Sequence, residues 1–484
     1  MIQRFRKNKL NKALSQAQNY AQWHNMAREL DFLDGYEKWR MEDESPHYNY
    51  LLLRRLTDQL RQYRRQENVY RLLDLLHDSL RRAQGDIAHP ALYSFARTGT
   101  KALVEEFLDE AEKGLRYLCD NDFPHLSHEK KVRLFSQAAA NFGRSALMLS
   151  GGATFGLFHL GVVGTLWDHG LLPTVICGSS MGSIVAAGTC TKTDAEIRAI
   201  REKRNIMDRD ALRRLSLKEA WREKAFLDQK TLLRNIRANV GDYTFSEAFL
   251  RTGRVLNISV SPTRMGMKPR VLNYITAPNV VIATAACASS CVPGVFAPAK
   301  LMAKDRTGQL LPYMANEKWV DGTIRGDIPV MRLARLHNVN HYIVSQTNPH
   351  VLPFLLYHDR KGVVPFTVEL VGTVFQAQVS QALNVVRHRV HVSPWRPILD
   401  QIYAVTGQQY MGDITVHPPF SPWMYRKLFK NPTQAEMERL TLEGERATWP
   451  KLAMIANQTR ISRVFDQCLK KLVPQGETVE ARPL

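Results

Sequence analysis

Two long stretches without a single Asp, Glu, Lys or Arg, Ser145–Trp167 and His169–Thr191, follow one another with only Asp168 between them. Each is long enough to cross a bilayer as a helix. Two membrane-spanning helices could not reverse direction over one residue, and both stretches are rich in Gly, Ser and Thr. They fit buried strand–turn–helix units better, as does the third charge-free stretch, Val280–Ala299. We therefore expect this part of the chain to form the interior of a folded domain.

Short apolar runs alternate with helical stretches from residue 145 onward. The run "SALMLS" (145–150) predicts a buried strand, a glycine-rich turn follows it, and a helix is expected over 157–170. Further strands are expected at residues 174–177, 254–261, 318–321 and 341–346. Strands that alternate with helices favour a mainly parallel sheet covered by helices on both faces.

The two ends of the chain show helical patterns instead. In the first 140 residues, apolar side chains recur at spacings of three and four. A long helix is expected over 433–466, before a polar tail. We therefore expect a helical N-terminal domain at 1–140, an α/β domain at 141–350 and a mixed, mainly helical region at 351–484.

The net charge limits the kinds of partner. It is formally +20, and the first 140 residues carry 23 Lys and Arg against 20 Asp and Glu, so the excess lies in the remainder. An anionic membrane surface and nucleic acid are the partners that such a charge suggests. No zinc-finger spacing or RNP-like aromatic motif accompanies it. We therefore expect no nucleic-acid partner.

The six cysteines indicate a reducing compartment. Cys287 and Cys291 stand close together, but no second pair or histidine cluster gives them metal-ligand spacing. We interpret all six as reduced thiols and expect neither a metal nor a cofactor. The basic start "MIQRFRKNKLNKALSQ" lacks the apolar core of a secretory signal. A cytoplasmic location is therefore expected.

The sequence "GSSMGS" (178–183) places Ser180 between Gly178 and Gly182, where one apolar run ends and another begins. In hydrolases, a Gly-x-Ser-x-Gly turn between a strand and a helix exposes the serine hydroxyl at the end of the sheet. The same residues also suit an ordinary turn of small residues. Taken alone, the motif leaves both interpretations open.

The preceding turn, "GGATFG" (151–156), bears on that choice. A phosphate-binding loop would need Lys and then Ser or Thr after its last glycine, and a dinucleotide-binding turn would need Gly in place of Ala153. A turn whose backbone N–H groups bind an oxyanion needs only a nucleophile nearby. Ser180 is in the next βα turn, and neighbouring βα turns emerge at the same edge of a parallel sheet. The oxyanion interpretation is therefore favoured.

A serine nucleophile also needs a base. Asp321, which ends a short predicted strand and precedes Gly322, is a well-placed acid, although Asp-Gly is also a common turn pair. A Ser–Asp–His arrangement would instead require one of the later histidines, namely His337, His341, His350 or His417.

The blocks "LSGGATFGLFHLGVVGTL", "GSSMGS" and "WVDGTIRGDIP" resemble, in order and spacing, three blocks of the patatin-like phospholipases. "ASSCVPGVFAP" (288–298) is similar to the stretch that precedes the acid in that family. The similarity is closer still to the triacylglycerol-lipase branch, in which "LYSFARTGTKALVEEFL" (92–108) and "NVNHYIVSQTNPHV" (338–351) have recognisable counterparts. It covers residues 20–415 and implies an α/β fold, a mainly parallel sheet between helices, preceded by an α-helical N-terminal domain.

The resemblance implies a catalytic Ser–Asp dyad without histidine. It makes Ser180 the nucleophile and Asp321 the proton acceptor. The oxyanion donors would be the amides of Gly151, Gly152 and Ala153, and the motif glycines are Gly156, Gly178, Gly182 and Gly322. Many members have a basic residue where this chain has Phe155, and its loss favours a neutral ester over a phospholipid.

The resemblance thus implies a triacylglycerol lipase that meets its lipid ester at a membrane or lipid-droplet surface. A phospholipase A, a lysophospholipase or a lipid acyltransferase would use the same dyad, and a non-catalytic lipid-binding protein of the membrane surface is the alternative from another class. The basic segment 192–237 has 14 Lys and Arg against 8 Asp and Glu. Apolar side chains lie among these charges: Ile197, Ile200, Leu215, Leu217, Trp221 and Phe226. Such a segment is expected to be attracted to anionic lipid.

Overall fold

The computed structural model describes residues 2–82, 84–203, 207–264, 267–322, 329–349, 351–352, 411–419 and 427–473. The chain divides into two compact units. The first consists of Met1–Ser145, Asn338–Asn340 and Trp449–Leu484, and the second of Ala146–His337 and His341–Thr448.

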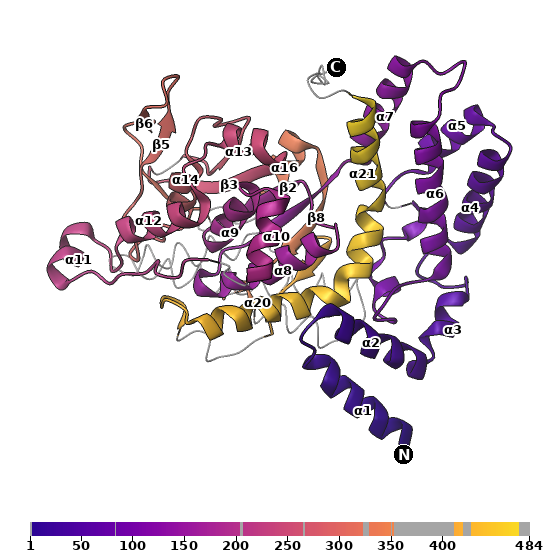
Figure 1. Cartoon of the computed structure of the whole chain (residues 1–484), viewed down its shortest axis with the longest axis horizontal. Coiled ribbons are helices and arrows are strands. Elements are labelled where there is room, and N and C mark those ends of the chain that lie inside the picture. The colour runs from indigo at the N-terminus through magenta and orange to yellow at the C-terminus, as the bar shows by residue number, and fades with distance from the viewer. Residues whose placement is uncertain are drawn as a thin grey trace, which may run out of the picture. The chain divides into compact units, whose positions relative to one another are not determined.

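The first unit is helical, as predicted for the N-terminal region (Figure 1). Its helices have apolar residues on one side, which pack into a common core around Leu53, Phe107 and Phe465. Its elements are α1 (Ile2–Ser15), α2 (Tyr20–Asp34), α3 (Tyr36–Met41), α4 (Tyr50–Arg65), α5 (Val69–Ser79), η1 (Gln84–Asp86), η2 (Pro90–Tyr93), α6 (Ala102–Asp120), α7 (His128–Phe142), η5 (Trp449–Lys451) and α21 (Leu452–Leu472).

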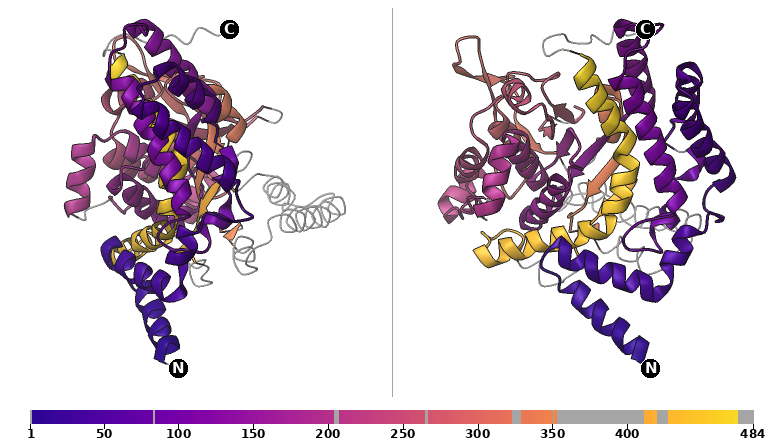
Figure 2. Two further views of the ribbon diagram at one scale, coloured as in Figure 1. Left: turned by 90° about the vertical axis from the view of Figure 1, so that its right-hand side faces the viewer. Right: turned by 45° about the vertical axis from the view of Figure 1, so that its right-hand side comes forward.

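The C-terminal helix α21 is part of this first unit. It lies alongside α6 and α7 in both views of Figure 2. Phe465 of α21 packs edge to face against Phe135 of α7, with ring centroids 6.3 Å apart. Residues from the two ends of the chain therefore share one core.

The second unit is built on a sheet. The described strands run in the order β4–β3–β2–β1–β8–β9, and β7 also pairs with β3. The pairs β1–β2, β2–β3 and β8–β9 are parallel, whereas β3–β4 and β3–β7 are antiparallel, which confirms the predicted mainly parallel sheet. The strands are β1 (Arg144–Leu149), β2 (Val175–Gly178), β3 (Val255–Pro262), β4 (Arg270–Leu272), β7 (Trp319–Asp321), β8 (Val339–Ser345) and β9 (Ile414–Val416), beside a separate hairpin of β5 (Leu301–Lys304) and β6 (Leu310–Tyr313).

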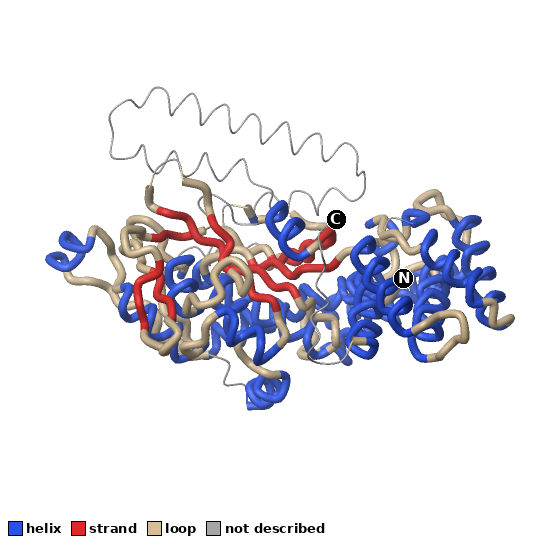
Figure 3. Tube along the Cα trace, turned by 90° about the horizontal axis from the view of Figure 1, so that it is seen from above, coloured by secondary structure: helices blue, strands red, loops and turns tan. Residues whose placement is uncertain are grey.

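Helices cover this sheet. Most of the unit's described helices lie below the layer of strands in Figure 3. Helix α9 packs on β2 and β3, and α14 packs on β3. The helices are η3 (Ala153–Leu157), α8 (Phe158–Asp168), α9 (Met181–Cys190), α10 (Asp194–Lys203), α11 (Leu217–Glu223), α12 (Gln229–Val240), α13 (Phe245–Thr252), α14 (Ile282–Ser289), α16 (Val330–His337) and α20 (Gln434–Thr448). No helix in the described part of the chain is both long and apolar enough to cross a membrane.

All five predicted strands are present, as β1, β2, β3, β7 and β8. The prediction of one long helix over 433–466 was wrong. The stretch is helical, but the short 3₁₀ turn Trp449–Lys451 divides it into α20 and α21, which belong to different units. Pro450 has no backbone N–H to donate within an α-helix, and its ring disturbs the preceding turn. Most of the region predicted to be mixed, 351–484, lies outside the described residues.

Candidate active site

Ser180 lies at the turn between β2 and α9, as predicted, with φ 51° and ψ −127°. A positive φ is uncommon for a residue with a side chain, and such strain costs about 1–3 kcal/mol. The flanking glycines are required by close packing. A Cβ on Gly178 would lie 2.3 Å from the carbonyl oxygen of Gly182, and one on Gly182 would lie 2.2 Å from that of Leu149. The turn is therefore pressed against the end of the sheet with Ser180 at its tip.

The strained backbone of Ser180 is held by a second serine. The N–H of Ser180 donates to Ser289 Oγ at 3.0 Å, and this hydroxyl donates in turn to the carbonyl oxygen of Ser259 at 2.7 Å. The N–H of Ser183 donates to the carbonyl oxygen of Ser180 at 2.9 Å. Both peptide groups of Ser180 are thus fixed in place.

Asp321 reaches the same part of the sheet through strand β7. Strand β3 pairs with β2 at Ile258↔Gly178 and with β7 at Val260↔Asp321. Because β4 occupies the opposite edge of β3 at both positions, β2 and β7 lie end to end along one edge. The positions paired with Gly178 and Asp321 are two residues apart on β3, which is about 7 Å along the strand. This arrangement brings Asp321 next to the turn that carries Ser180.

Burial and backbone contacts fix Asp321. Its side chain is fully buried, and its N–H donates to the carbonyl oxygen of Cys291 at 3.0 Å. The following residue, Gly322, passes so close to Ser259 that a Cβ would lie 2.3 Å from the Ser259 carbonyl oxygen. The carboxylate is therefore set on a rigid strand end and shielded from bulk water.

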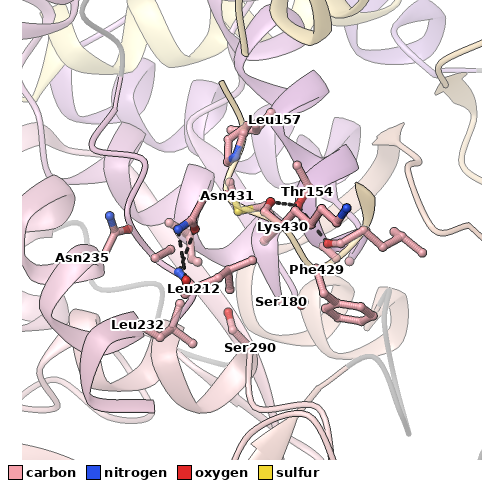
Figure 4. Close-up of a pocket in the computed structure, with 18 of the residues that line it drawn as sticks. Thr154, Leu157, Ser180, Leu212, Leu232, Asn235, Ser290, Phe429, Lys430 and Asn431 are labelled. Carbon is pink, nitrogen blue, oxygen red and sulfur yellow. Dashed lines mark hydrogen bonds between the residues drawn. The ribbon is translucent and has the colours of Figure 1, made fainter. Parts of the chain in front are cut away.

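A cavity of about 300 Å³ joins the predicted site residues (Figure 4). Ser180, Asp321 and the turn residues Gly151, Gly152 and Ala153 all contribute to its wall. The four predicted motif glycines all stand where a Cβ would clash with neighbouring atoms. Most other lining side chains are apolar, among them Leu157, Met181, Ile184, Leu232, Val292 and Phe296. The cavity thus combines a serine, a carboxylate and a glycine turn with an apolar interior.

The glycine-rich turn lines this cavity. Ala153 has φ 47° and begins the short helix η3. The first N–H groups of a helix have no partner inside it. Here the N–H of Thr154 donates to Leu428 at 3.2 Å, and Thr347 Oγ1 donates to the carbonyl oxygen of Gly151 at 3.1 Å. These contacts hold the turn from both ends.

His159 supports the turn from behind, and sequence reasoning missed this role. It is fully buried, with Nε2 2.9 Å from the carbonyl oxygen of Ser150 and Nδ1 2.7 Å from Ser345 Oγ. Burial lowers the pKa of His159 from 6.5 to about 4, so the ring is neutral at pH 7. Nε2 must then carry the proton, because a carbonyl oxygen only accepts. The only signal in the sequence was a histidine soon after the glycine-rich block.

Three of the four histidines considered as bases lie elsewhere. His337 is buried with Nε2 2.9 Å from Asn257 Oδ1, and His417 Nδ1 lies 3.1 Å from the carbonyl oxygen of Pro418. His341 is buried on β8. None of these three lines the cavity, and His350 falls outside the described residues.

A late segment, residues 428–432, forms part of the cavity rim. Thr154 Oγ1 donates to the carbonyl oxygens of Leu428, at 2.8 Å, and Lys430, at 3.1 Å. Asn431 and Leu212 exchange two hydrogen bonds, at 2.8 and 3.0 Å, which Figure 4 shows as dashed lines. Nothing in the sequence pattern indicated that these segments meet.

Known proteins resemble this chain along most of its length. Residues 147–334 match the model of the family described as patatin-like phospholipase, and residues 1–140 match a domain of unknown function (DUF3336). The chain is 32% identical to triacylglycerol lipase ptl3 of Schizosaccharomyces pombe over 98% of this chain and the whole of that protein. It is 34% identical to triacylglycerol lipase 4 of Saccharomyces cerevisiae and to triacylglycerol lipase SDP1L of Arabidopsis thaliana, in each case over 94% of this chain. It spans about half the length of these two relatives, 52% and 58%.

Proposed function

The chain belongs to the patatin-like phospholipase family, and from this premise we propose that it is a serine hydrolase of lipid esters, specifically a triacylglycerol lipase. One observation carries the proposal. A strained serine, a buried aspartate and a glycine-rich turn line one apolar cavity. The names of its relatives support the choice of substrate.

In the proposed mechanism, Ser180 Oγ attacks the ester carbonyl carbon while its proton passes to the Asp321 carboxylate. The carbonyl oxygen becomes an oxyanion, which the amides of Gly152 and Ala153 stabilise together with that of Gly151. Collapse of this intermediate breaks the bond to the alcohol oxygen, and Asp321 returns the proton to the leaving group. An acyl-enzyme and a diacylglycerol result.

The second half-reaction repeats these steps with water. Asp321 accepts a proton from a water molecule, whose oxygen attacks the acyl carbon. The second oxyanion forms in the same turn, and Ser180 leaves with the proton held by Asp321. A free aspartate has a pKa of about 3.9 and is a weak base toward serine. Exclusion of water from the cavity, which the buried position of Asp321 favours, would strengthen a hydrogen bond from the Ser180 hydroxyl to the Asp321 carboxylate during the reaction.

The cavity lining and the apolar residue Phe155 packed behind it support a neutral ester. Phe155, where many family members have a basic residue, is buried and packs with Leu157 and Met437. It offers no charge to a phosphate group. The apolar walls suit an acyl chain instead.

A phospholipase A or lysophospholipase is the second candidate, because two cations also line the cavity. Arg209 and Lys430 are both exposed. Either could attract a phosphate group. Transfer of the acyl group to a lipid alcohol in place of water would use the same intermediate.

Because the proposed substrate is insoluble, we propose that the protein works in the cytoplasm, on the surface of a membrane or lipid droplet.

A non-catalytic lipid-binding protein is the contrasting hypothesis. Fatty-acid release from triacylglycerol, phosphatidylcholine and lysophosphatidylcholine should be measured side by side, with Arg209→Gln and Lys430→Gln in parallel. We expect triacylglycerol to be preferred and both variants to retain that activity. Preference for a phospholipid that falls in these variants would favour the second candidate, and no release from any substrate would reject both.

A further inference from the structure

The helix α11 and Phe226, which follows it, expose a group of large apolar side chains. Leu217, Trp221 and Phe226 have 93%, 87% and 72% of their surface exposed. Leu217 and Trp221 are four residues apart and therefore lie on the same face of the helix. No residue of α11 is buried, and the helix stands away from the rest of its unit in Figure 1. Exposed side chains of this size in one small element mark a contact surface.

The element that carries these side chains is a finger, residues 213–228. Its two arms are joined where the N–H of Leu215 donates to the Phe226 carbonyl oxygen at 3.0 Å and that of Asp228 donates to Arg213 at 2.9 Å. A capping box between Ser216 and Glu219 starts α11 within the finger itself. The finger therefore keeps its shape without burying its tip.

The base of the finger is part of the cavity wall. Leu212, just before the finger, and Leu232, just after it, both line the cavity. The N–H groups of Phe226 and Leu227 donate to the carbonyl oxygen of Val295, at 3.1 and 2.9 Å, next to the lining residue Phe296. The finger is thus attached to its unit directly at the cavity wall.

The charge of the tip selects the kind of partner. Lys218, Arg222 and Lys224 are all exposed beside the apolar side chains. Trp, Phe and Leu next to Lys and Arg are the composition of segments that lie in the interface of an anionic lipid layer. The other apolar residues of the basic segment noted in the sequence, Ile197, Ile200 and Leu215, are half-buried and belong to its packing.

We propose that the finger docks the protein on an anionic lipid surface, with Leu217, Trp221 and Phe226 inserted among the lipids and Lys218, Arg222 and Lys224 against their head groups. This inference rests on the proposed function, since docking serves to deliver a lipid ester to the cavity. The docking proposal and the proposed function can fail separately, because binding to a lipid surface needs no catalysis.

Vesicle flotation of the full chain carrying Ser180→Ala tests the docking without hydrolysis. The vesicles are phosphatidylcholine alone or mixed with phosphatidylserine. One variant changes Leu217, Trp221 and Phe226 to Ser, and a second changes Lys218, Arg222 and Lys224 to Gln. A matched apolar control is Leu250→Ser, which is 81% exposed on α13. A matched charge control changes three exposed cations elsewhere, Lys300, Arg306 and Lys318, to Gln.

We expect the parent to bind mixed vesicles and to release them as salt rises. The apolar variant should bind at least tenfold more weakly, and the charge variant should lose several-fold affinity together with the salt dependence, while both controls bind as the parent does. If the apolar variant bound vesicles as tightly as the Ser180→Ala parent, the docking proposal would be overturned. The same would follow if the controls lost as much binding as the finger variants. With Ser180 restored, finger variants should keep their rate on a water-soluble short-chain ester. Absence of that rate in the unaltered protein would instead reject the proposed function.

Discussion

The backbone N–H of Ser180 donates a hydrogen bond to Ser289 Oγ at 3.0 Å, and the same hydroxyl donates to the Ser259 carbonyl oxygen at 2.7 Å. One side chain on α14 thus connects the turn of Ser180 to strand β3. Ser259 precedes Val260, the residue that pairs with Asp321. The hydroxyl of Ser289 therefore couples the position of the proposed nucleophile to the strand that aligns the proposed base.

Ser289→Ala should lower kcat about tenfold or more while KM changes less than twofold, because the buried N–H of Ser180 loses its partner and the strained turn relaxes. The cavity itself is untouched. Thr189→Ala is a suitable control, since its buried hydroxyl donates to Val185 within α9 at 2.8 Å. Steady-state kinetics on a soluble ester, with circular dichroism to establish folding, make the comparison. An unchanged kcat in folded Ser289→Ala would contradict the coupling.

Ser180→Ala should reduce ester hydrolysis about a thousandfold or more, whereas Ser179→Ala should keep a substantial part of it. The reason is geometric. Ser180 lines the cavity, while Ser179 is fully buried before the turn. A fluorophosphonate probe followed by peptide mapping should label Ser180. If Ser179→Ala lost the label and Ser180→Ala kept it, the nucleophile would be wrongly assigned.

Asp321→Asn should be as damaging as loss of the serine, because an amide cannot accept the serine proton. His337→Gln should cost stability more than rate. His337 is buried against Asn257, and its ring does not line the cavity. Rates on a soluble ester and urea unfolding separate the two effects. If His337→Gln were folded and as inactive as Asp321→Asn, a histidine would have to take part.

The strands around the site could be predicted because each is a short apolar run followed at once by small residues. The run before Gly178 and the run that ends at Asp321 are local patterns, and the parallel arrangement then implies a shared edge. The contacts that set the exact geometry join distant segments. His159 meets Ser345, and Leu212 meets Asn431. Neither residue of such a pair carries a periodic signal, since each contact joins two single positions that are brought together only by the tertiary fold.

At Pro450 the sequence did carry a signal, but the prediction of one long helix was still wrong. The proline was visible in the sequence, and a proline inside a helical pattern usually ends or kinks the helix. The apolar spacing on either side continued regularly enough to favour one helix. Only the packing shows that the two halves belong to different units, with α21 in the core that contains Phe107.

The strain at Ser180 should appear in stability. With φ 51°, Ser180→Gly removes about 1–3 kcal/mol of backbone strain and adds only about 0.5–1 kcal/mol of chain entropy cost. We expect Ser180→Gly to be more stable than Ser180→Ala by urea unfolding, although both are inactive. The control is Ser183, which lies inside α9. There the Gly variant should be less stable than the Ala variant, because glycine is less favourable than alanine within a helix. Equal stability of the two Ser180 variants would mean that the strain in the turn is no larger than the entropy cost of glycine, about 0.5–1 kcal/mol.

His159 should make folding sensitive to mild acid. Burial lowers the pKa of His159 from 6.5 to about 4, so between these values the unfolded chain binds a proton that the folded protein excludes. The contribution of this group is therefore fully present above pH 6.5 and is lost as the pH falls toward 4, by up to about 3 kcal/mol. Protonation would also remove the acceptor at Nδ1 that faces Ser345 Oγ. The free energy of unfolding should fall more steeply from pH 6.5 to 4 in the wild type than in His159→Gln, whereas His77→Gln, at an exposed position, should follow the wild type. Parallel curves for the wild type and His159→Gln would show that this ring is not the group that titrates.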